Sequence, residues 1–283
     1  MRAGLVAGVI ALLWSSGSAV TAPTEAAHYD AFFLWAGVNP QPALDNAHSL
    51  YLLQSQVEAT DPVRLVAQRP ALPQVSESEV WMVVRVETLD WPEAVYVQVL
   101  AALARWRAAG NNLVGLQIDF DAGTRHLENY ATFLSDLRKR LPRGYRLSIT
   151  GLLDWSSNGD PAGLAALGSV VDEIVLQIYQ GRRVIPGYAG YLAALDRLQI
   201  PFRIGLLQGG DWDAPDHLAA NPWFRGYVVF LVNAQARIAE SAIIATIGCA
   251  PALANRPLSA MTPAPVIMPR APPKAEAVPA MAP

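Results

Sequence analysis

The chain has 283 residues, a formal net charge of −3 and 52% hydrophobic residues, which is enough for one large domain with a substantial core. The mild acidity gives no reason to expect a nucleic acid or an anionic membrane surface as a partner. The single cysteine, Cys249, excludes an intrachain disulfide and a cluster of thiolate metal ligands, and we expect it to be buried and unreactive.

The first residues are typical of a secretory signal. Arg2 supplies the positive charge, residues 3–14 are apolar, and Val20-Thr21-Ala22 is a small-residue cleavage site. The apolar stretch is short for a membrane span, although an uncleaved anchor is the alternative. We therefore expect a monomer that is periplasmic or secreted, without stable membrane insertion. Its predicted parts are a signal peptide (1–22), a barrel domain (23–249) and a Pro/Ala-rich disordered tail (250–283).

Strands and helices alternate along most of the chain. In chain order the hydrophobic pattern predicts strands at 29–36, 49–57, 63–68, 80–87, 113–121, 145–152, 173–179, 201–206 and 226–232. It predicts helices at 92–109, 127–140, 162–167, 188–198 and 234–247. From residue 80 onward the spacing is roughly 30 residues, as in βαβ units with a parallel sheet. The predicted fold is an α/β, TIM-like (β/α)8 barrel whose first units are irregular. A doubly wound sheet is the alternative, although no glycine-rich phosphate loop opens a helix.

The predicted strand 113–121 ends in two acids. Alternate side chains of a strand point to opposite faces, so Gln117, Asp119 and Asp121 share one face and apolar residues share the other. Burying unpaired carboxylates is costly, so this face should look into a polar cavity.

Four other predicted strands also carry polar groups opposite their apolar face. They are Arg85 and Glu87 with Trp81 and Val83; Arg146, Ser148 and Thr150; Gln177 and Tyr179; and Arg203. A barrel interior filled only for stability is mostly branched aliphatic, and functional groups collect at the carboxyl ends of the strands. This excess of polar groups therefore indicates a functional pocket, with a structural ion-pair network as the alternative.

The paired acids favour acid–base chemistry on a neutral, polyhydroxylated ligand. Two close, desolvated carboxylates do not both ionise freely, so the pKa of one should be raised. The proton it keeps is what a glycosidic leaving oxygen needs. Arg85 or Arg203 is expected to keep the other acid ionised. Trp35, Trp91, Trp155 and Trp212 fall at or after strand ends. They are either stacking platforms for sugar rings or packing anchors.

A metal site is the competing chemistry, because Glu87, Asp119, Asp121 and Asp154 offer oxygen ligands for a hard cation. The four histidines show no ligand pairing, so zinc is not expected. We expect neither a metal nor another cofactor.

Two motifs resemble a known family. The stretch Val114 to Asp121 (VGLQIDFD) is similar to D-G-x-D-x-D-x-E on the fourth strand of glycoside hydrolase family 18, the chitinase-like barrels, and Gln177 to Gln180 (QIYQ) is similar to its sixth-strand M-x-Y-D. The region 29–247 resembles a bacterial domain family of unknown function, number 3142, through GLQIDFD, LSITGLLDW and VLQIYQ.

The resemblance to the chitinase-like barrels implies roles for three residues. Asp121 would protonate the leaving group, Asp119 would orient an acetamido group that acts as the nucleophile, and Tyr179 would donate a hydrogen bond to that group. Asp121 is one methylene shorter than the family's glutamate. A two-carboxylate mechanism that pairs Asp121 with Glu87 or Asp154 is the alternative.

These observations predict an exported protein that acts on a polysaccharide or glycan. Its catalytic residues would be Asp121, Asp119, Tyr179 and Glu87. The expected substrate-binding residues are Arg85, Gln117, Thr150, Asp154, Trp155, Gln177, Trp35, Trp91 and Trp212. Two alternatives stay open, a carbohydrate-binding barrel without catalysis and a metal-dependent hydrolase.

Overall fold

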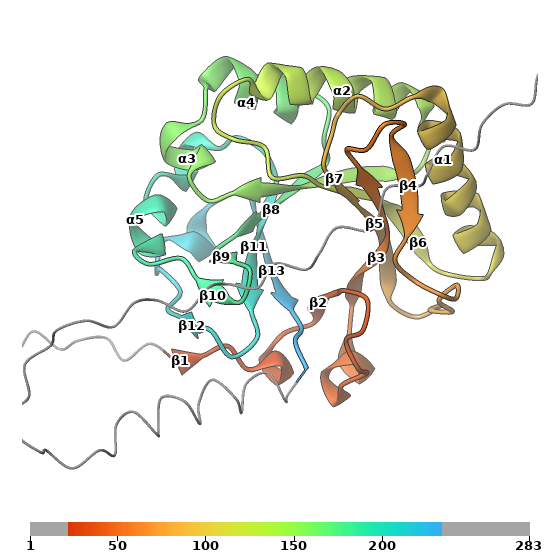
Figure 1. The fold of residues 1–283 in the computed structure, drawn as a ribbon. Helices are drawn as coiled ribbons and strands as arrows, with labels where there is room; N and C mark the ends of the chain where they lie inside the picture. Colours follow the sequence, from red (N-terminus) through yellow and green to blue (C-terminus); the bar gives the residue numbers. More distant parts are fainter. Residues whose placement is uncertain (1–21, 234–283) are drawn as a thin grey trace, which may run out of the picture. The chain divides into compact units, whose positions relative to one another are not determined.

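The computed structural model describes residues 22–233, which include a closed ring of eight parallel strands (Figure 1). In sheet order these are β2 (Ala31–Leu34), β13 (Phe224–Phe230), β11 (Phe202–Leu207), β8 (Glu173–Gln177), β7 (Arg146–Leu152), β6 (Leu113–Asp119), β5 (Glu79–Val86) and β3 (Ser49–Glu58). The ring is closed because β2 pairs with both β13 and β3. The predicted TIM-like barrel is confirmed. In chain order β6 is the fourth barrel strand and β8 the sixth, the strands to which the resemblance assigned the two motifs.

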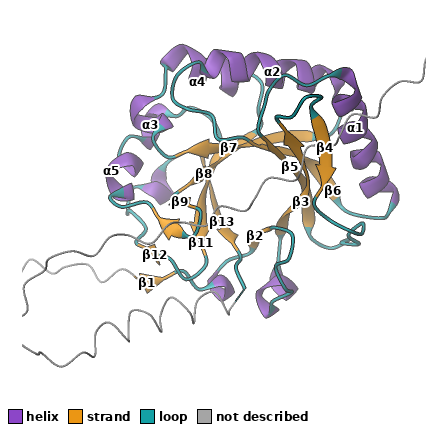
Figure 2. Ribbon diagram, in the orientation of Figure 1, coloured by secondary structure: helices purple, strands orange, loops and turns teal. Residues whose placement is uncertain are grey.

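The helices lie outside the ring of strands (Figure 2). They are α1 (Glu93–Ala108), α2 (Leu127–Arg140), α3 (Trp155–Asn158), α4 (Pro161–Gly168) and α5 (Tyr188–Leu192). The first units are irregular, as predicted. A 3₁₀ turn, η2 (Pro42–Asn46), joins β2 to β3, and the antiparallel strand β4 (Arg64–Ala67) follows β3 instead of a helix.

Short elements complete the described chain. Strand β1 (Ala22–Pro23) pairs antiparallel with β12 (Asp211–Trp212), and β9 (Tyr179–Gln180) pairs antiparallel with β10 (Arg183–Val184). Three further 3₁₀ turns are η1 (Ala26–His28), η3 (Leu195–Arg197) and η4 (Leu218–Ala220).

Helix α2 shows how the pattern produces this packing. Leu127, Tyr130, Leu134 and Leu137 recur at helical spacing and are all buried, and the helix ends just before Pro142. Residues with this spacing form one apolar stripe, so the helix covers the outer face of the sheet.

The barrel interior has an apolar cluster of its own, separate from the layer between the strands and the helices. Its buried members are Ala31, Phe33, Tyr51, Leu53, Trp81, Val83, Val175 and Val228. The Trp81 ring stacks on Tyr51 with centroids 5.7 Å apart. Gly115 makes room for the indole, because a Cβ at that position would lie 2.5 Å from Trp81 Cζ3.

Part of the polar interior is a structural ion-pair network near the amino ends of the strands. Glu173 accepts hydrogen bonds from Tyr51 (2.7 Å), Ser148 (3.3 Å) and Arg203 (2.9 Å). Arg203 is thus engaged by Glu173. Of the two arginines proposed to hold the paired acids, only Arg85 contacts them.

Several predicted elements end earlier in the structure, and three of these differences concern segments beside the pocket. Strand β6 stops at Asp119, so Asp121 lies in the following loop, and β8 stops at Gln177 because the chain turns into the β9–β10 hairpin. The helix predicted at 188–198 is α5 followed by η3, and Gly190 within it lowers the helix propensity.

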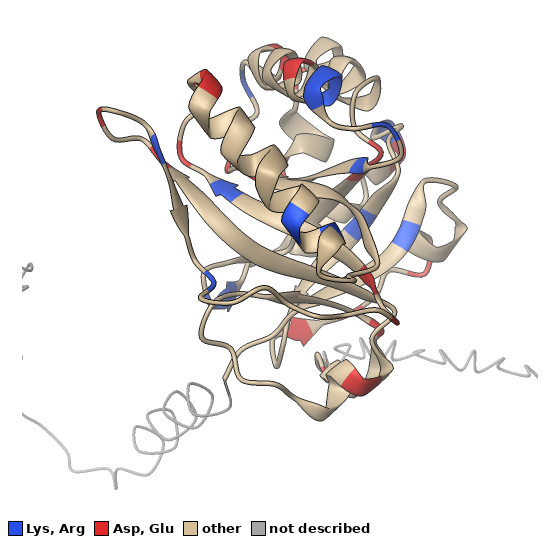
Figure 3. Ribbon diagram, turned by 90° about the vertical axis from the view of Figure 1, so that its right-hand side faces the viewer, with Lys and Arg blue, Asp and Glu red and all other residues tan. Residues whose placement is uncertain are grey.

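The predicted signal peptide apart from Ala22, the helix 234–247, Cys249 and the tail 250–283 lie outside the described residues. Within residues 22–233, no helix combines the length and apolar character that crossing a bilayer requires. Acidic and basic positions are interspersed on the side of the ribbon shown in Figure 3.

Candidate functional site

A pocket of about 870 Å³ lies at the carboxyl ends of the barrel strands. Six of the eight strands, or the loops that follow them, line it: β2, β5, β6, β7, β8 and β13. The lining residues are Trp35, Ala36, Gly37, Val38, Arg85, Asp121, Leu152, Leu153, Asp154, Gln177, Tyr179, Gln180, Gly181, Arg182, Ile185, Tyr191, Phe230, Leu231, Val232 and Asn233. This is the end at which barrels of this type place their functional groups.

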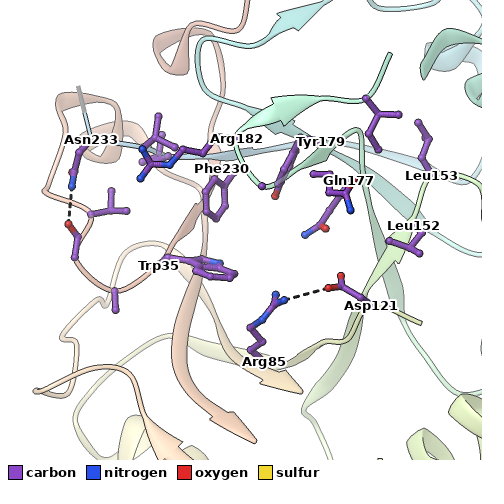
Figure 4. A pocket seen from close by; sticks show the side chains of 18 of the residues that line it. Trp35, Arg85, Asp121, Leu152, Leu153, Gln177, Tyr179, Arg182, Phe230 and Asn233 are labelled. Atoms are coloured by element: carbon purple, nitrogen blue, oxygen red, sulfur yellow. Dashed lines mark hydrogen bonds and ion pairs between the residues drawn. The ribbon is translucent and has the colours of Figure 1, made fainter. Parts of the chain in front are cut away.

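One arginine holds both acids of the predicted pair. Arg85 Nη1 donates to Asp119 Oδ2 at 3.0 Å, and Arg85 Nη2 donates to Asp121 Oδ2 at 3.2 Å (Figure 4). Thr150 Oγ1 donates to the other oxygen of Asp119 at 2.9 Å. The face predicted from the alternation of β6 therefore points into the barrel, where it meets complementary groups.

The two acids differ in their surroundings. Asp119 is 3% exposed and lies below the pocket lining, whereas the Asp121 side chain is 58% exposed and lines the pocket. Burial raises the pKa of Asp119, while Arg85 and Thr150 oppose that shift. The charge of Asp121 adds to the rise but is a minor cause. Desolvation, more than repulsion between the acids, thus sets the direction of the shift.

Tyr179 supplies a hydroxyl donor to the pocket. Its side chain is buried, and burial together with the nearby charge of Asp119 raises its pKa well above the ordinary value. The phenol therefore stays protonated at physiological pH and can donate to a ligand. Figure 4 shows Tyr179 and Gln177 across the pocket from Trp35.

Aromatic side chains form one wall of the pocket, and Tyr179 adjoins it because its ring centroid lies 5.5 Å from that of Phe230. Trp35 and Phe230 meet edge to face with centroids 5.6 Å apart, and the Arg85 guanidinium lies 5.2 Å from the centre of the Trp35 ring. Trp35 follows the first barrel strand and Phe230 ends the last, so the wall joins segments far apart in sequence. Of the four tryptophans proposed to contact a sugar, Trp35 lines the pocket.

The structure places the other three tryptophans in the packed core. Trp155 has 0% exposure, and its Nε1 donates to the carbonyl oxygen of Ala122 at 3.0 Å. Trp91 is 8% exposed and lies against α1 and α2, and Trp212 is 7% exposed and stacks on Tyr188. These indoles are packing anchors, because each folds back onto apolar neighbours instead of facing the pocket.

Glu87 is also apart from the pocket lining. Its carboxylate accepts hydrogen bonds from Gln56 Nε2 (2.7 Å) and from the backbone of Ala59 (3.1 Å). Gln117 and Thr150 lie in the barrel interior beneath the pocket, where Gln117 donates to Ser148 and Thr150 to Asp119. They support the pocket floor and do not line it.

The oxygen ligands proposed for a metal are not gathered. Within residues 22–233, no group of three or more His, Asp or Glu side chains is placed to hold a metal ion. Asp119 and Asp121 instead share Arg85.

Some pocket residues were not anticipated from sequence. Phe230 follows from the same alternation rule, because it shares a face with the interior residue Val228. Arg182 and Asn233 lie in segments beyond a strand end, where side-chain direction has no period. The glycine in Gln180-Gly181-Arg182 was the one turn signal available.

Comparison with known protein families finds a match over part of the chain. Residues 78–195 match the family model DUF3142, a domain of unknown function. The predicted similarity is thus confirmed from the residue before β5 to the start of η3, a shorter span than the expected 29–247. The match includes Arg85, Asp119, Asp121 and Tyr179. No curated protein matches the chain.

Several solved structures resemble the chain at low identity. The spore cortex-lytic enzyme SleL of Bacillus cereus shares 15% identity over 62% of this chain and 49% of its own, with a TM-score of 0.42. The chitinase domain of CotE from Clostridium difficile shares 11% identity over 70% of this chain and 68% of its own, with a TM-score of 0.43. The xylanase and α-amylase inhibitor XAIP-II of Scadoxus multiflorus shares 11% identity over 70% of this chain and 91% of its own, with a TM-score of 0.46. The chain spans about half of the SleL chain, and likenesses this low do not establish an activity.

Proposed function

We propose that the pocket binds a carbohydrate. The observation that carries this proposal is that aromatic side chains, Trp35 and Phe230, and polar groups, Tyr179 and Asp121, line one pocket of about 870 Å³. That volume is within the usual range for sites that take small molecules. Sugar rings offer an apolar face for aromatic side chains and hydroxyls that both donate and accept hydrogen bonds.

Three amide side chains in the lining extend this match. Gln177, Gln180 and Asn233 each carry both a donor and an acceptor group. The Asn233 side chain donates a hydrogen bond to the carbonyl oxygen of Gly37 at 2.9 Å, and Gly37 lies in the loop after Trp35. Polar groups held in place in this way bind a ligand at a smaller entropic cost than mobile ones.

Glycoside hydrolysis is the second candidate, and Asp154 favours it. Asp121 and Asp154 line the same pocket, and Asp154 Oδ1 is buried with no hydrogen-bond partner among the described residues. In a two-carboxylate mechanism one acid protonates the leaving oxygen and the other is nucleophile or base. Asp121 Oδ2 is engaged by Arg85, so we assign the proton donor to Asp154 and the carboxylate role to Asp121.

A glycan array tests the binding proposal. The purified protein is expected to bind a set of related glycans, and Trp35→Ala to lose at least about tenfold in affinity because it removes the aromatic wall. Tyr145→Ala is the matched control, since this aromatic side chain precedes β7 at the amino end of the barrel. Absence of binding to any glycan, or equal losses in both variants, contradicts the proposal.

Hydrolysis is tested on the glycans that bind. Asp121→Asn and Asp154→Asn are each expected to abolish turnover while sparing affinity, because the amide keeps the shape and loses the acid. Intact glycan after prolonged incubation with the unaltered protein instead leaves binding as the function.

We also propose that the mature protein is periplasmic or secreted, on the basis of the signal pattern in residues 1–22. Cell fractionation with N-terminal sequencing tests this, and a cytoplasmic, full-length protein overturns it.

A further inference from the structure

The hairpin that follows β8 sits at the pocket and has a fixed backbone. Gln180 pairs with Arg183 and Tyr179 with Val184. The backbone N–H of Ile185 donates to the carbonyl oxygen of Ile178 at 2.8 Å, which closes the base of the hairpin. Gly181, at the tip, has φ +58°, a conformation that glycine adopts without steric cost.

The hairpin is also anchored on the neighbouring loop. Val184 packs so closely on Gly210 that a Cβ there would lie 2.6 Å from Val184 Cγ2. The base of the hairpin is thus held by backbone pairing and by packing, and its tip residue Arg182 starts from a defined position in the pocket lining.

Arg182 differs from the other arginine of the pocket. Arg85 is neutralised by Asp119 and Asp121, whereas Arg182 takes part in no ion pair or hydrogen bond within residues 22–233. In Figure 4 Arg182 and Asp121 lie on opposite sides of the pocket view. Among the described residues, the pocket therefore presents a guanidinium without an acidic partner, away from Asp121.

A neutral sugar does not require such a group, because the amides of the lining offer donors and acceptors for its hydroxyls. A guanidinium has a planar fork of donors that matches carboxylate and sulfate oxygens, and it stays charged at any physiological pH. We propose that the pocket selects acidic glycans and that Arg182 binds their anionic substituent. This inference rests on the carbohydrate-binding function proposed above and adds the ligand class.

The same arrangement sets the direction of the ligand. An anionic substituent at Arg182 is kept away from Asp121, which would repel it. The uncharged part of the glycan then extends toward Asp121 and Asp154. A glycan bound in the reverse direction would bring its anion to these acids, so the two poles favour one orientation.

Calorimetric titration with matched oligosaccharides tests the inference. The probes are a galactose oligomer that ends in a single galacturonate residue, a neutral galactose oligomer of equal length and the same oligomer with a single terminal sulfate. The full-length protein is expected to bind one or both acidic probes about tenfold more tightly than the neutral probe, the usual scale for one charge-assisted pair. Arg182→Gln is expected to remove that preference while leaving the affinity for the neutral probe unchanged.

Arg183→Gln is the matched control, because Arg183 lies beside Arg182 on the same hairpin and does not line the pocket. It is expected to keep the full preference. Equal affinity for all three probes, or the same loss in both variants, overturns the acidic-glycan inference and leaves carbohydrate binding intact. Failure to bind any probe, together with an empty glycan array, overturns both proposals.

Discussion

Replacing Arg85 with glutamine tests whether this one side chain neutralises the acids of the pocket floor. In the unaltered protein Asp119 is 3% exposed, and without Arg85 its side chain keeps only the hydrogen bond from Thr150 at 2.9 Å. A buried charge that has lost its partner typically costs about 3–5 kcal/mol of stability. Because the Arg85 side chain is 31% exposed, water reaches the vacated position, and we expect a loss of about 2–3 kcal/mol at neutral pH.

The loss should depend on pH in a defined direction. Burial already raises the pKa of Asp119 above its unfolded value, so the folded state binds this proton more tightly than the unfolded chain. The stability that comes from protonation is full below the unfolded pKa of about 3.9 and is lost as pH rises through the folded pKa. Without Arg85 the folded pKa rises further. The destabilisation should therefore shrink on acidification, to about 1 kcal/mol for the lost packing on Trp35.

Urea unfolding followed by tryptophan fluorescence measures the free energy of unfolding of the variant and of the unaltered protein, at pH 7.5 and at pH 4. Arg64→Gln is the control, because Arg64 pairs with Glu58 at 2.9 Å but is 61% exposed, and we expect a loss below about 1 kcal/mol at both pH values. Adding Asp119→Asn to Arg85→Gln should recover most of the stability at pH 7.5. An equal loss at both pH values, or no recovery in the double variant, refutes the argument that Asp119 is a buried charge held by Arg85.

Two further predictions concern packing and the pocket wall. Gly115→Ala should destabilise by about 1–3 kcal/mol, because its Cβ would meet the backbone carbonyl oxygen of Arg146 and the Trp81 ring. Gly123→Ala, with nothing within 4 Å, should be nearly neutral in the same unfolding assay. Trp155→Ala should cost about 3–5 kcal/mol, since it empties a fully buried site, whereas Trp35→Ala should keep most of the stability and lose glycan affinity. Thermal unfolding and calorimetric titration of both tryptophan variants decide this, and a stable Trp155→Ala that fails to bind glycan would reverse the assignment.

The barrel was predictable because its strands follow a rule that needs no tertiary information. Side chains alternate along any strand, so the inward direction of Gln117 and Asp119 follows from the register of their apolar neighbours. The rule fails where strands end. Asp121 lies two residues past β6, and its position depends on the loop and on Arg85.

Loop residues were the least predictable part of the site. Trp91, Trp155 and Trp212 resemble Trp35 in their place after a strand, but their indoles are buried, which depends on the helices that happen to cover each loop. The sequence pattern does not predict which loops the helices cover.

The ring closes where β2 meets β13, through the pairs Val229–Phe32 and Phe230–Phe33. The aromatic wall of the pocket stands on this seam, so its two halves are made at the beginning and the end of barrel synthesis. A chain that stops short of β13 has Arg85, Asp119 and Asp121 but lacks Phe230, one of the two side chains of this wall. The proposed binding site therefore needs both ends of the barrel sequence.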